Sequence, residues 1–176
     1  MNIKHILGAT VLASFVFGCG GGDKSSSNDQ SIKGNLKGDW QTECLSNGND
    51  SIIVYASHDL IDGSALYGEG TELYSTSDCS GSVTTSWKLV GPVSYGGTVS
   101  TSICSAQKFD ATFSLIEIDG VSYDGEKFDR VMSQLSALQR NRSSLACIYR
   151  DNYLEGTRSD GARPDEVNTI FVFYRQ

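Results

Sequence analysis

Residues 83–89 alternate between two kinds of side chain, and this pattern constrains the fold more than any other. Apolar or β-branched residues occupy every second position, and polar residues lie between them: Val83, Thr85, Trp87 and Leu89 against Thr84, Ser86 and Lys88. A period of two is typical of a β-strand that buries one face. The chain also has 19 glycines and only two prolines, which favours strands joined by tight turns. We therefore expect a mainly β domain.

The same reasoning predicts the other elements along the chain. Further strands are expected over residues 36–44, 51–57, 65–74, 109–118 and 169–175. Gly96-Gly97 indicates a two-residue hairpin turn. Five apolar residues at helical spacing predict one amphipathic helix of about 13 residues before the last strand: Phe128, Val131, Met132, Leu135 and Leu138. Residues 141–168 are expected to form a long loop.

Four of the five cysteines lie within the predicted β domain, and they suggest two disulfides. An even number of cysteines in an exported domain is typical of a disulfide framework. Three pairings are possible, and we favour Cys44–Cys79 with Cys104–Cys147, because bridges between neighbouring cysteines suit a meandering sheet. No two of these cysteines are close enough in sequence for a zinc site. We therefore predict neither a metal nor another cofactor.

The N-terminus has the composition of an export signal. Lys4 and His5 precede an uncharged apolar run over residues 6–17, which is too short to cross a hydrocarbon core of ~30 Å as a helix. The following Val16-Phe17-Gly18-Cys19 resembles the lipobox of bacterial lipoproteins. The alternative is a secretory peptide that is cut elsewhere and leaves Cys19 without a lipid.

The lipobox resemblance implies a membrane anchor and a compartment. Residues 1–18 would be a signal peptide, and Cys19 would carry a diacylglyceryl group and an N-acyl chain such as palmitate. Residues 19–34 would be a flexible tether, and residues 35–176 a β domain. Several acyl chains hold a protein stably to a membrane. Gly20 after the cysteine favours the inner leaflet of the outer membrane, facing the periplasm, with exposure at the cell surface as the alternative.

The charge distribution argues against nucleic acid as a partner. The formal net charge is −7, and every arginine lies within residues 130–175. The rest of the predicted domain is strongly acidic, which repels a phosphate backbone. Ion pairing between the arginine-rich end and the acidic body is the expected use of these arginines.

Residues at both ends of the predicted domain resemble the lipocalin-like (calycin) family. Leu36-x-Gly38-x-Trp40-x-x-x-Cys44 is similar to the first strand of these proteins, and Arg163-Pro164 and Asp78-Cys79 are similar to segments of small bacterial lipoproteins of this type. The resemblance implies a closed up-and-down antiparallel barrel with Trp40 at one end and Arg175 packed on its indole. A disulfide-linked β-sandwich is the alternative fold.

No catalytic motif stands out, so we expect a binding protein and not an enzyme. His58 is the one histidine beyond the signal, and we interpret it as a turn residue. Two functions remain. The barrel could hold a small apolar ligand against Trp87, Leu89, Phe113 and Leu115. Alternatively, a solid barrel could bind an envelope protein or polymer without catalysis, through exposed loops such as 141–168.

Overall fold

The computed structural model describes residues 35–61, 64–135, 138–158, 162–167 and 171–176. The expected signal peptide, Cys19 and the tether up to residue 34 lie outside these residues. The description below therefore concerns the predicted β domain.

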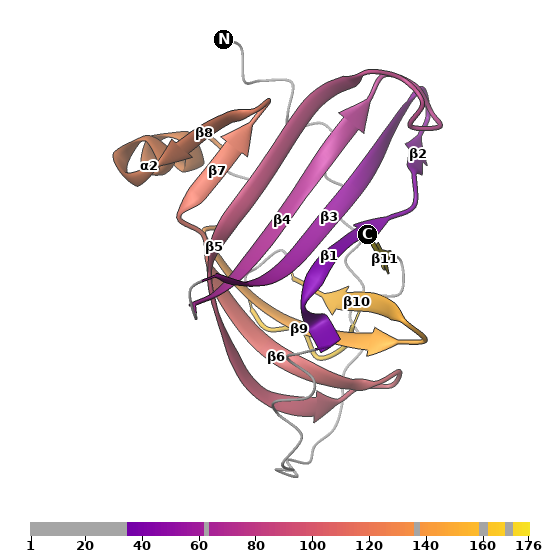
Figure 1. Cartoon of the computed structure of the whole chain (residues 1–176), viewed down its shortest axis with the longest axis vertical. Helices are drawn as coiled ribbons and strands as arrows, with labels where there is room; N and C mark the ends of the chain where they lie inside the picture. The colour runs from indigo at the N-terminus through magenta and orange to yellow at the C-terminus, as the bar shows by residue number, and fades with distance from the viewer. Residues whose placement is uncertain (1–34, 62–63, 136–137, 159–161, 168–170) are drawn as a thin grey trace.

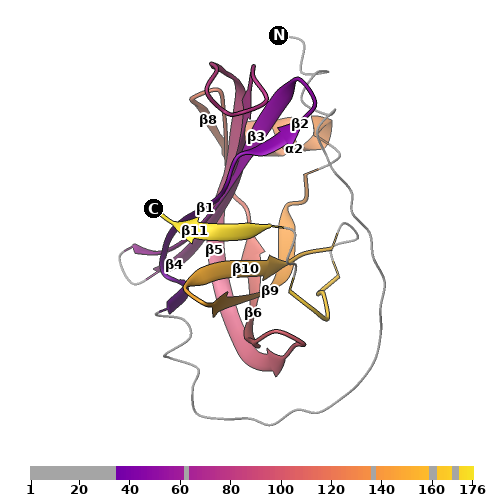
Figure 2. The same ribbon diagram turned by 90° about the vertical axis from the view of Figure 1, so that its right-hand side faces the viewer.

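Eight antiparallel strands close into a barrel, as the sequence predicts. The strands are β1 (Gly38–Thr42), β3 (Asp50–Ile61), β4 (Ser64–Tyr74), β5 (Val83–Ser100), β6 (Ser105–Thr112), β9 (Asn141–Tyr149), β10 (Asn152–Gly156) and β11 (Val172–Arg175). Neighbours in the barrel follow one another along the chain, and β1 pairs with β11 to close the ring. Figures 1 and 2 show the resulting up-and-down arrangement.

A small module is inserted between β6 and β9. It consists of β7 (Leu115–Ile118), β8 (Val121–Asp124) and helix α2 (Gly125–Gln134). Strand β7 pairs with residues 87–90 of β5, so the module continues the sheet beyond the barrel (Figure 1). The helix is shorter than expected, and it precedes three strands where the sequence predicts one. A further short strand, β2 (Leu45–Asn47), pairs with the start of β3.

The long strand β5 belongs to two parts of the structure. Its first half pairs with β4 and β7, and its second half pairs with β6. Between the halves, Gly91 lies against the backbone that leaves β6: a Cβ atom on Gly91 would be 2.0 Å from the carbonyl oxygen of Thr112. The close approach requires glycine. It also separates residues 109–118, expected as one strand, into β6 and β7.

The expected hairpin turn at Gly96-Gly97 is wrong. Both glycines lie within β5, where the pairing with β6 shifts register between Tyr95 and Thr98, as in a β-bulge. The turn into β6 lies further along, where the Thr101 amide and hydroxyl both donate to the carbonyl oxygen of Cys104 at 2.9 and 2.8 Å. Neither glycine has a positive φ angle, so the pair does not form the two-residue turn that Gly-Gly favours.

The expected long loop over residues 141–168 is also wrong in its first half. Residues 141–156 form the β9–β10 hairpin, which completes the barrel. Arg150 and Asp151 make the turn with φ angles of 51° and 66°. Glycine or asparagine is the usual choice for such backbone angles, so Arg-Asp gives only a weak signal for a turn.

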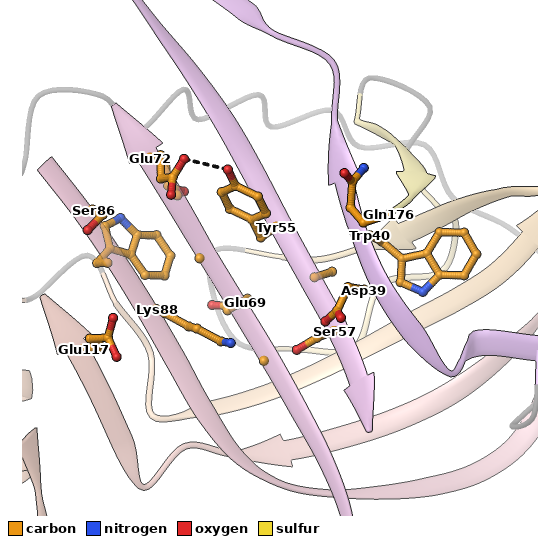
Figure 3. A pocket seen from close by; sticks show the side chains of 15 residues that line it. Asp39, Trp40, Tyr55, Ser57, Glu69, Glu72, Ser86, Lys88, Glu117 and Gln176 are labelled. Atoms are coloured by element: carbon orange, nitrogen blue, oxygen red, sulfur yellow. Dashed lines mark hydrogen bonds between the residues drawn. The ribbon is translucent and has the colours of Figure 1, made fainter. Parts of the chain in front are cut away.

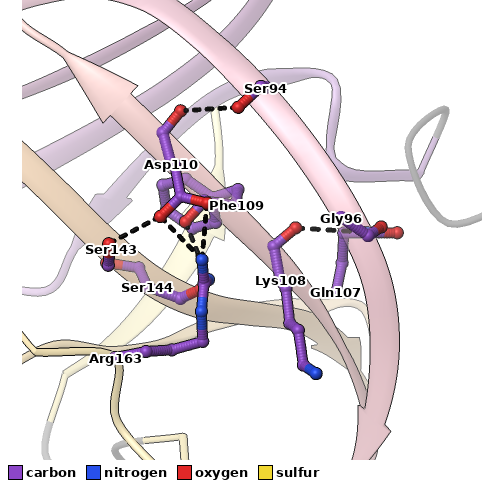
Figure 4. Close-up of polar contacts among 9 residues, drawn as sticks. All are labelled: Ser94, Gly96, Gln107, Lys108, Phe109, Asp110, Ser143, Ser144 and Arg163. Carbon is purple, nitrogen blue, oxygen red and sulfur yellow. Dashed lines mark hydrogen bonds and ion pairs between the residues drawn. The ribbon is translucent and has the colours of Figure 1, made fainter.

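Residues 162–167 pack against the outside of this hairpin. Arg163 donates from Nη1 to the carbonyl oxygens of Phe109 (3.0 Å) and Ser144 (2.7 Å), and it forms an ion pair with Asp110 (Figure 4). Val167 then covers a small apolar cluster outside the barrel: Ala106, Leu145, Cys147 and Leu154. The segment gives the barrel a second, minor core.

Both disulfides have the pairing that the sequence favours. Cys44 is bonded to Cys79, and Cys104 is bonded to Cys147, with Cα–Cα distances of 5.9 and 6.6 Å. The first bridge joins the segment after β1 to the β4–β5 connection. The second ties the turn before β6 to β9 and lies beside the outer apolar cluster.

Trp40 is buried where β1 pairs with β11. Its indole Nε1 donates to the carbonyl oxygen of Leu36 at 2.9 Å, and its ring stacks on Tyr153 with centroids 5.6 Å apart. The Arg175 guanidinium lies 4.9 Å from the centre of the indole, in a cation–π arrangement, and donates to the carbonyl oxygen of Lys37. The geometry agrees with the one expected for this pair.

Candidate functional site

The four residues expected to line a ligand cavity lie where β5 meets the inserted module. Leu89 and Phe113 are fully buried and belong to the main apolar cluster, which also includes Phe128 and Leu135 from the helical side. Trp87 and Leu115 are half-buried and pair with Ile118 and Val90, respectively. Leu89 and Phe113 are therefore packed against other side chains of the core.

Aromatic rings fill the centre of the barrel. His58 lies on β3 with 2% of its surface exposed, so its interpretation as a turn residue is wrong. Four rings surround its imidazole, with centroids 4.9 to 6.0 Å away: Tyr67, Tyr95, Phe109 and Tyr153. His58 lies on the same face of β3 as Ile52, Val54 and Ala56. This period-two pattern was the signal in the sequence that could have placed His58 in the core.

Hydrogen bonds link these rings to a buried carboxylate. The two ring nitrogens of His58 lie 2.8 Å from the hydroxyl of Tyr95 and 3.0 Å from that of Tyr153. Tyr153 donates to Glu155 at 2.6 Å, and Tyr67 donates to the same carboxylate at 2.9 Å. Burial lowers the pKa of His58 to about 3, and burial raises the pKa of Glu155.

A buried ion pair extends this network. Arg142 on β9 bonds to Glu69 on β4, and the Tyr67 hydroxyl lies 3.4 Å from Glu69 as well. Three buried polar atoms have no protein partner among the described residues: Gln107 Oε1, Arg142 Nε and Ser144 Oγ. Single ordered waters commonly bind atoms of this kind. The interior thus combines a mainly apolar, aromatic core with a network of buried polar groups.

A groove of about 320 Å³ lies on the outer face of the barrel, over β1, β3, β4 and β5 (Figure 3). This is in the size range of small-molecule sites. Its rim and walls carry mostly polar side chains: Asp39, Ser57, Glu72, Ser86, Lys88 and Glu117. Tyr55 and Gln176 also line the groove, and Trp87 is the one residue of the expected cavity that contributes to it.

Two glycines of β4 form the floor of the groove. Gly68 and Gly70 occupy outward-facing positions, where other residues would place side chains into the groove. A Cβ atom on Gly68 would lie 2.5 Å from the Ser57 hydroxyl oxygen and 3.5 Å from Cε of Lys88. One on Gly70 would lie 2.6 Å from the carbonyl oxygen of Trp87. The glycines keep this hollow open.

One wall of the groove is held in place by a shared carboxylate. Glu72 accepts hydrogen bonds of 2.6 Å from both the Tyr55 and the Tyr74 hydroxyls. Burial, together with the hydrogen bond to Glu72, raises the pKa of Tyr55, so the phenol remains protonated and continues to donate. Because its hydroxyl is fixed, the Tyr55 ring presents a rigid surface beside the floor.

Lys88 lies across the floor and is not engaged with the carboxylate opposite. In register it faces Glu117 on β7, yet within the described part of the chain it forms no ion pair. Figure 3 shows its side chain extending away from Glu117 towards Ser57. Asp39 is the register partner of Ser57 on the other side. The ammonium group is therefore available in the middle of the groove.

No protein-family model matches this chain, and no curated protein matches it either. Over the described ranges, no group of three or more His, Cys, Asp or Glu side chains is placed to hold a metal ion. None of the helices in those ranges combines the length and the apolar character needed to span a membrane.

Proposed function

We propose that this chain is a lipid-anchored barrel protein of the bacterial envelope that binds a partner or ligand without catalysis. The anchor rests on Val16-Phe17-Gly18-Cys19 and the glycine- and serine-rich run that follows it. The two disulfides are what an exported, oxidised compartment favours. The stacked Trp40 and Arg175 support a relationship to lipocalin-like proteins.

The filled centre of the barrel is the observation that carries the solid-barrel form of this proposal. An apolar ligand would need unfilled apolar space, whereas the centre of the barrel holds packed aromatic rings together with His58, Glu69 and Glu155. Bringing an apolar molecule against such groups removes hydrogen bonds that buried polar atoms require. Binding in the barrel interior is therefore the less supported alternative, and the binding surface is assigned to the outside.

The anchor is tested by replacing Cys19. Full-length protein and the Cys19→Ser variant are expressed in a bacterial host that is fed a labelled palmitate analogue. We expect label and cleavage after Gly18 in the parent chain, and neither in the variant, because serine has no thiol to accept the diacylglyceryl group. Intact mass and gel fluorescence measure both.

The paired variant Cys44→Ser/Cys79→Ser is the matched control, since it removes cysteines from the β domain only. It should incorporate label like the parent. If Cys19→Ser is cleaved and labelled to the same extent as the parent, the anchor proposal is wrong.

A further inference from the structure

We propose that the outer groove binds a neutral, hydroxyl-rich ligand, namely a saccharide. The inference rests on the proposed function in treating the protein as a binding module, and it adds the site and the ligand class. It does not depend on the lipid anchor.

The shape of the groove suits a flat ring that lies over a β-sheet. Gly68 and Gly70 remove two side chains from the middle of β4, so a ligand can approach the backbone there. Tyr55 borders this space, and Glu72 fixes its hydroxyl at 2.6 Å. A tyrosine that is already immobilised offers contact area at a low entropic cost. Its ring can pack against the C–H face of a sugar.

The charges of the lining argue against an anionic ligand, and Lys88 opposes a cation at the centre of the floor. Four acidic residues line the groove. Glu69 is paired with Arg142, and the carboxylates of Asp39, Glu72 and Glu117 oppose an anion. Lys88 occupies the floor between them and opposes a cation at that point. A neutral ligand meets neither repulsion.

The hydrogen-bonding groups of the lining match hydroxyl groups, which both donate and accept. Lys88 supplies donors, Asp39 supplies acceptors, and the Ser57 hydroxyl and the Gln176 amide can do either. Ser57 is the register partner of Asp39, and a Cβ on Gly68 would touch both Ser57 and Lys88. Donors and acceptors therefore lie within reach of one ring.

The test is a titration of isotopically labelled protein with cellotriose, maltotriose and chitotriose, followed by amide NMR. We expect at least one of the three to shift the amide signals of Gly68 and Gly70 at millimolar concentration. Lys88→Met should weaken that binding by about tenfold or more, because a hydrogen bond to a charged group is lost. Lys108→Met is the matched control: Lys108 is a half-buried lysine on β6, outside the groove, and its loss should leave the affinity unchanged.

Three results would overturn the proposal. The first is that none of the three saccharides shifts these glycine signals in folded protein. The second is that spermidine or inorganic phosphate shifts them while the saccharides do not, because the ligand class would then be wrong. The third is equal weakening by Lys88→Met and Lys108→Met, because the site would then lie elsewhere. None of these results bears on acylation of Cys19, which its own assay decides.

Discussion

His58 enters the barrel core as a neutral imidazole, because burial lowers its pKa from 6.5 to about 3. An unfolded chain binds a proton on this residue at a higher pH than the folded chain does. The stability that the neutral residue contributes is therefore complete above about pH 6.5 and is lost as the pH falls towards about 3. The loss amounts to about 1.4 kcal/mol for each pH unit in that window.

We predict that His58→Gln makes the unfolding free energy less sensitive to acid than it is in the parent. Urea unfolding of both proteins, from about pH 7 to about pH 4, measures the difference, with the slope taken from linkage. Glu155 acts in the opposite direction, because its raised pKa adds stability as the pH falls. That contribution is present in both proteins, so the difference isolates His58. Parallel curves would contradict the prediction.

At the scale of single residues, the sequence predicts which face of its strand His58 occupies, but it does not predict which side chains contact it. The alternation through Ile52, Val54 and Ala56 places the imidazole inside the barrel. Tyr95 and Tyr153, which hydrogen-bond to it, come from strands far along the chain. Only the closed barrel brings these three residues together, so the polar network could not be predicted from local pattern.

At the scale of the elements, strands with strict alternation could be predicted, but bulges and turns without their usual residues could not. The first half of β5 follows its alternating pattern, but the sequence does not distinguish the bulge at Gly96-Gly97 from a turn. The β9–β10 hairpin was missed because Arg150 and Asp151 adopt positive φ angles without glycine. The helix was predicted correctly as an amphipathic element, since Phe128 is its buried residue.

The two disulfides should contribute unequally to stability. Their sequence separations of 35 and 43 residues are similar, and the chain-entropy model gives about 4 kcal/mol for each. However, Cys147 is buried in the outer apolar cluster, whereas Cys44 is exposed. We predict that Cys104→Ser/Cys147→Ser loses more unfolding free energy than Cys44→Ser/Cys79→Ser, because a serine at 147 also buries a hydroxyl.

Urea unfolding under non-reducing conditions compares the two double variants, and each serves as the control for the other. Equal losses would indicate that loop closure alone determines the contribution of each bridge. A larger loss from the Cys44–Cys79 pair would contradict the role given to the outer apolar cluster.

At the largest scale, the described residues form a barrel whose interior is filled by its own side chains. Residues from five strands meet at its centre: His58, Tyr67, Tyr95, Phe109 and Tyr153. We predict that protein purified from a bacterial host carries no stoichiometric apolar molecule. Its mass under native electrospray conditions should equal the mass of the same sample after denaturation.

The comparison should be repeated with Tyr67→Ala, which removes one ring from the centre and leaves a cavity. Uptake of an added apolar probe by this variant and not by the parent would show that the rings exclude ligands. A reproducible extra mass on the parent, released on denaturation, would restore the barrel interior as the binding site.

The fold of the β domain was easier to predict from the sequence than the candidate site. Eight strands in simple succession and four cysteines in neighbouring pairs favour a meandering barrel. The groove depends instead on small outward-facing residues such as Gly68 and Ser57. Small residues on an exposed face form no periodic pattern that could be recognised in the sequence. Which of them share one hollow is decided by the register of β1, β3 and β4.

The closure of the barrel has a consequence for the order in which the barrel and the groove form during folding. The backbone carbonyl oxygen of Asp39 on β1 accepts a hydrogen bond from the backbone amide of Gln176, next to β11, and both residues line the groove. These strands are far apart in the chain, and their pairing is among the most non-local contacts, which form slowly. A molecule with an unfinished ring has no complete groove. Only the fully folded barrel would therefore bind the ligand. A bound ligand would in turn stabilise the closed barrel against opening between β1 and β11.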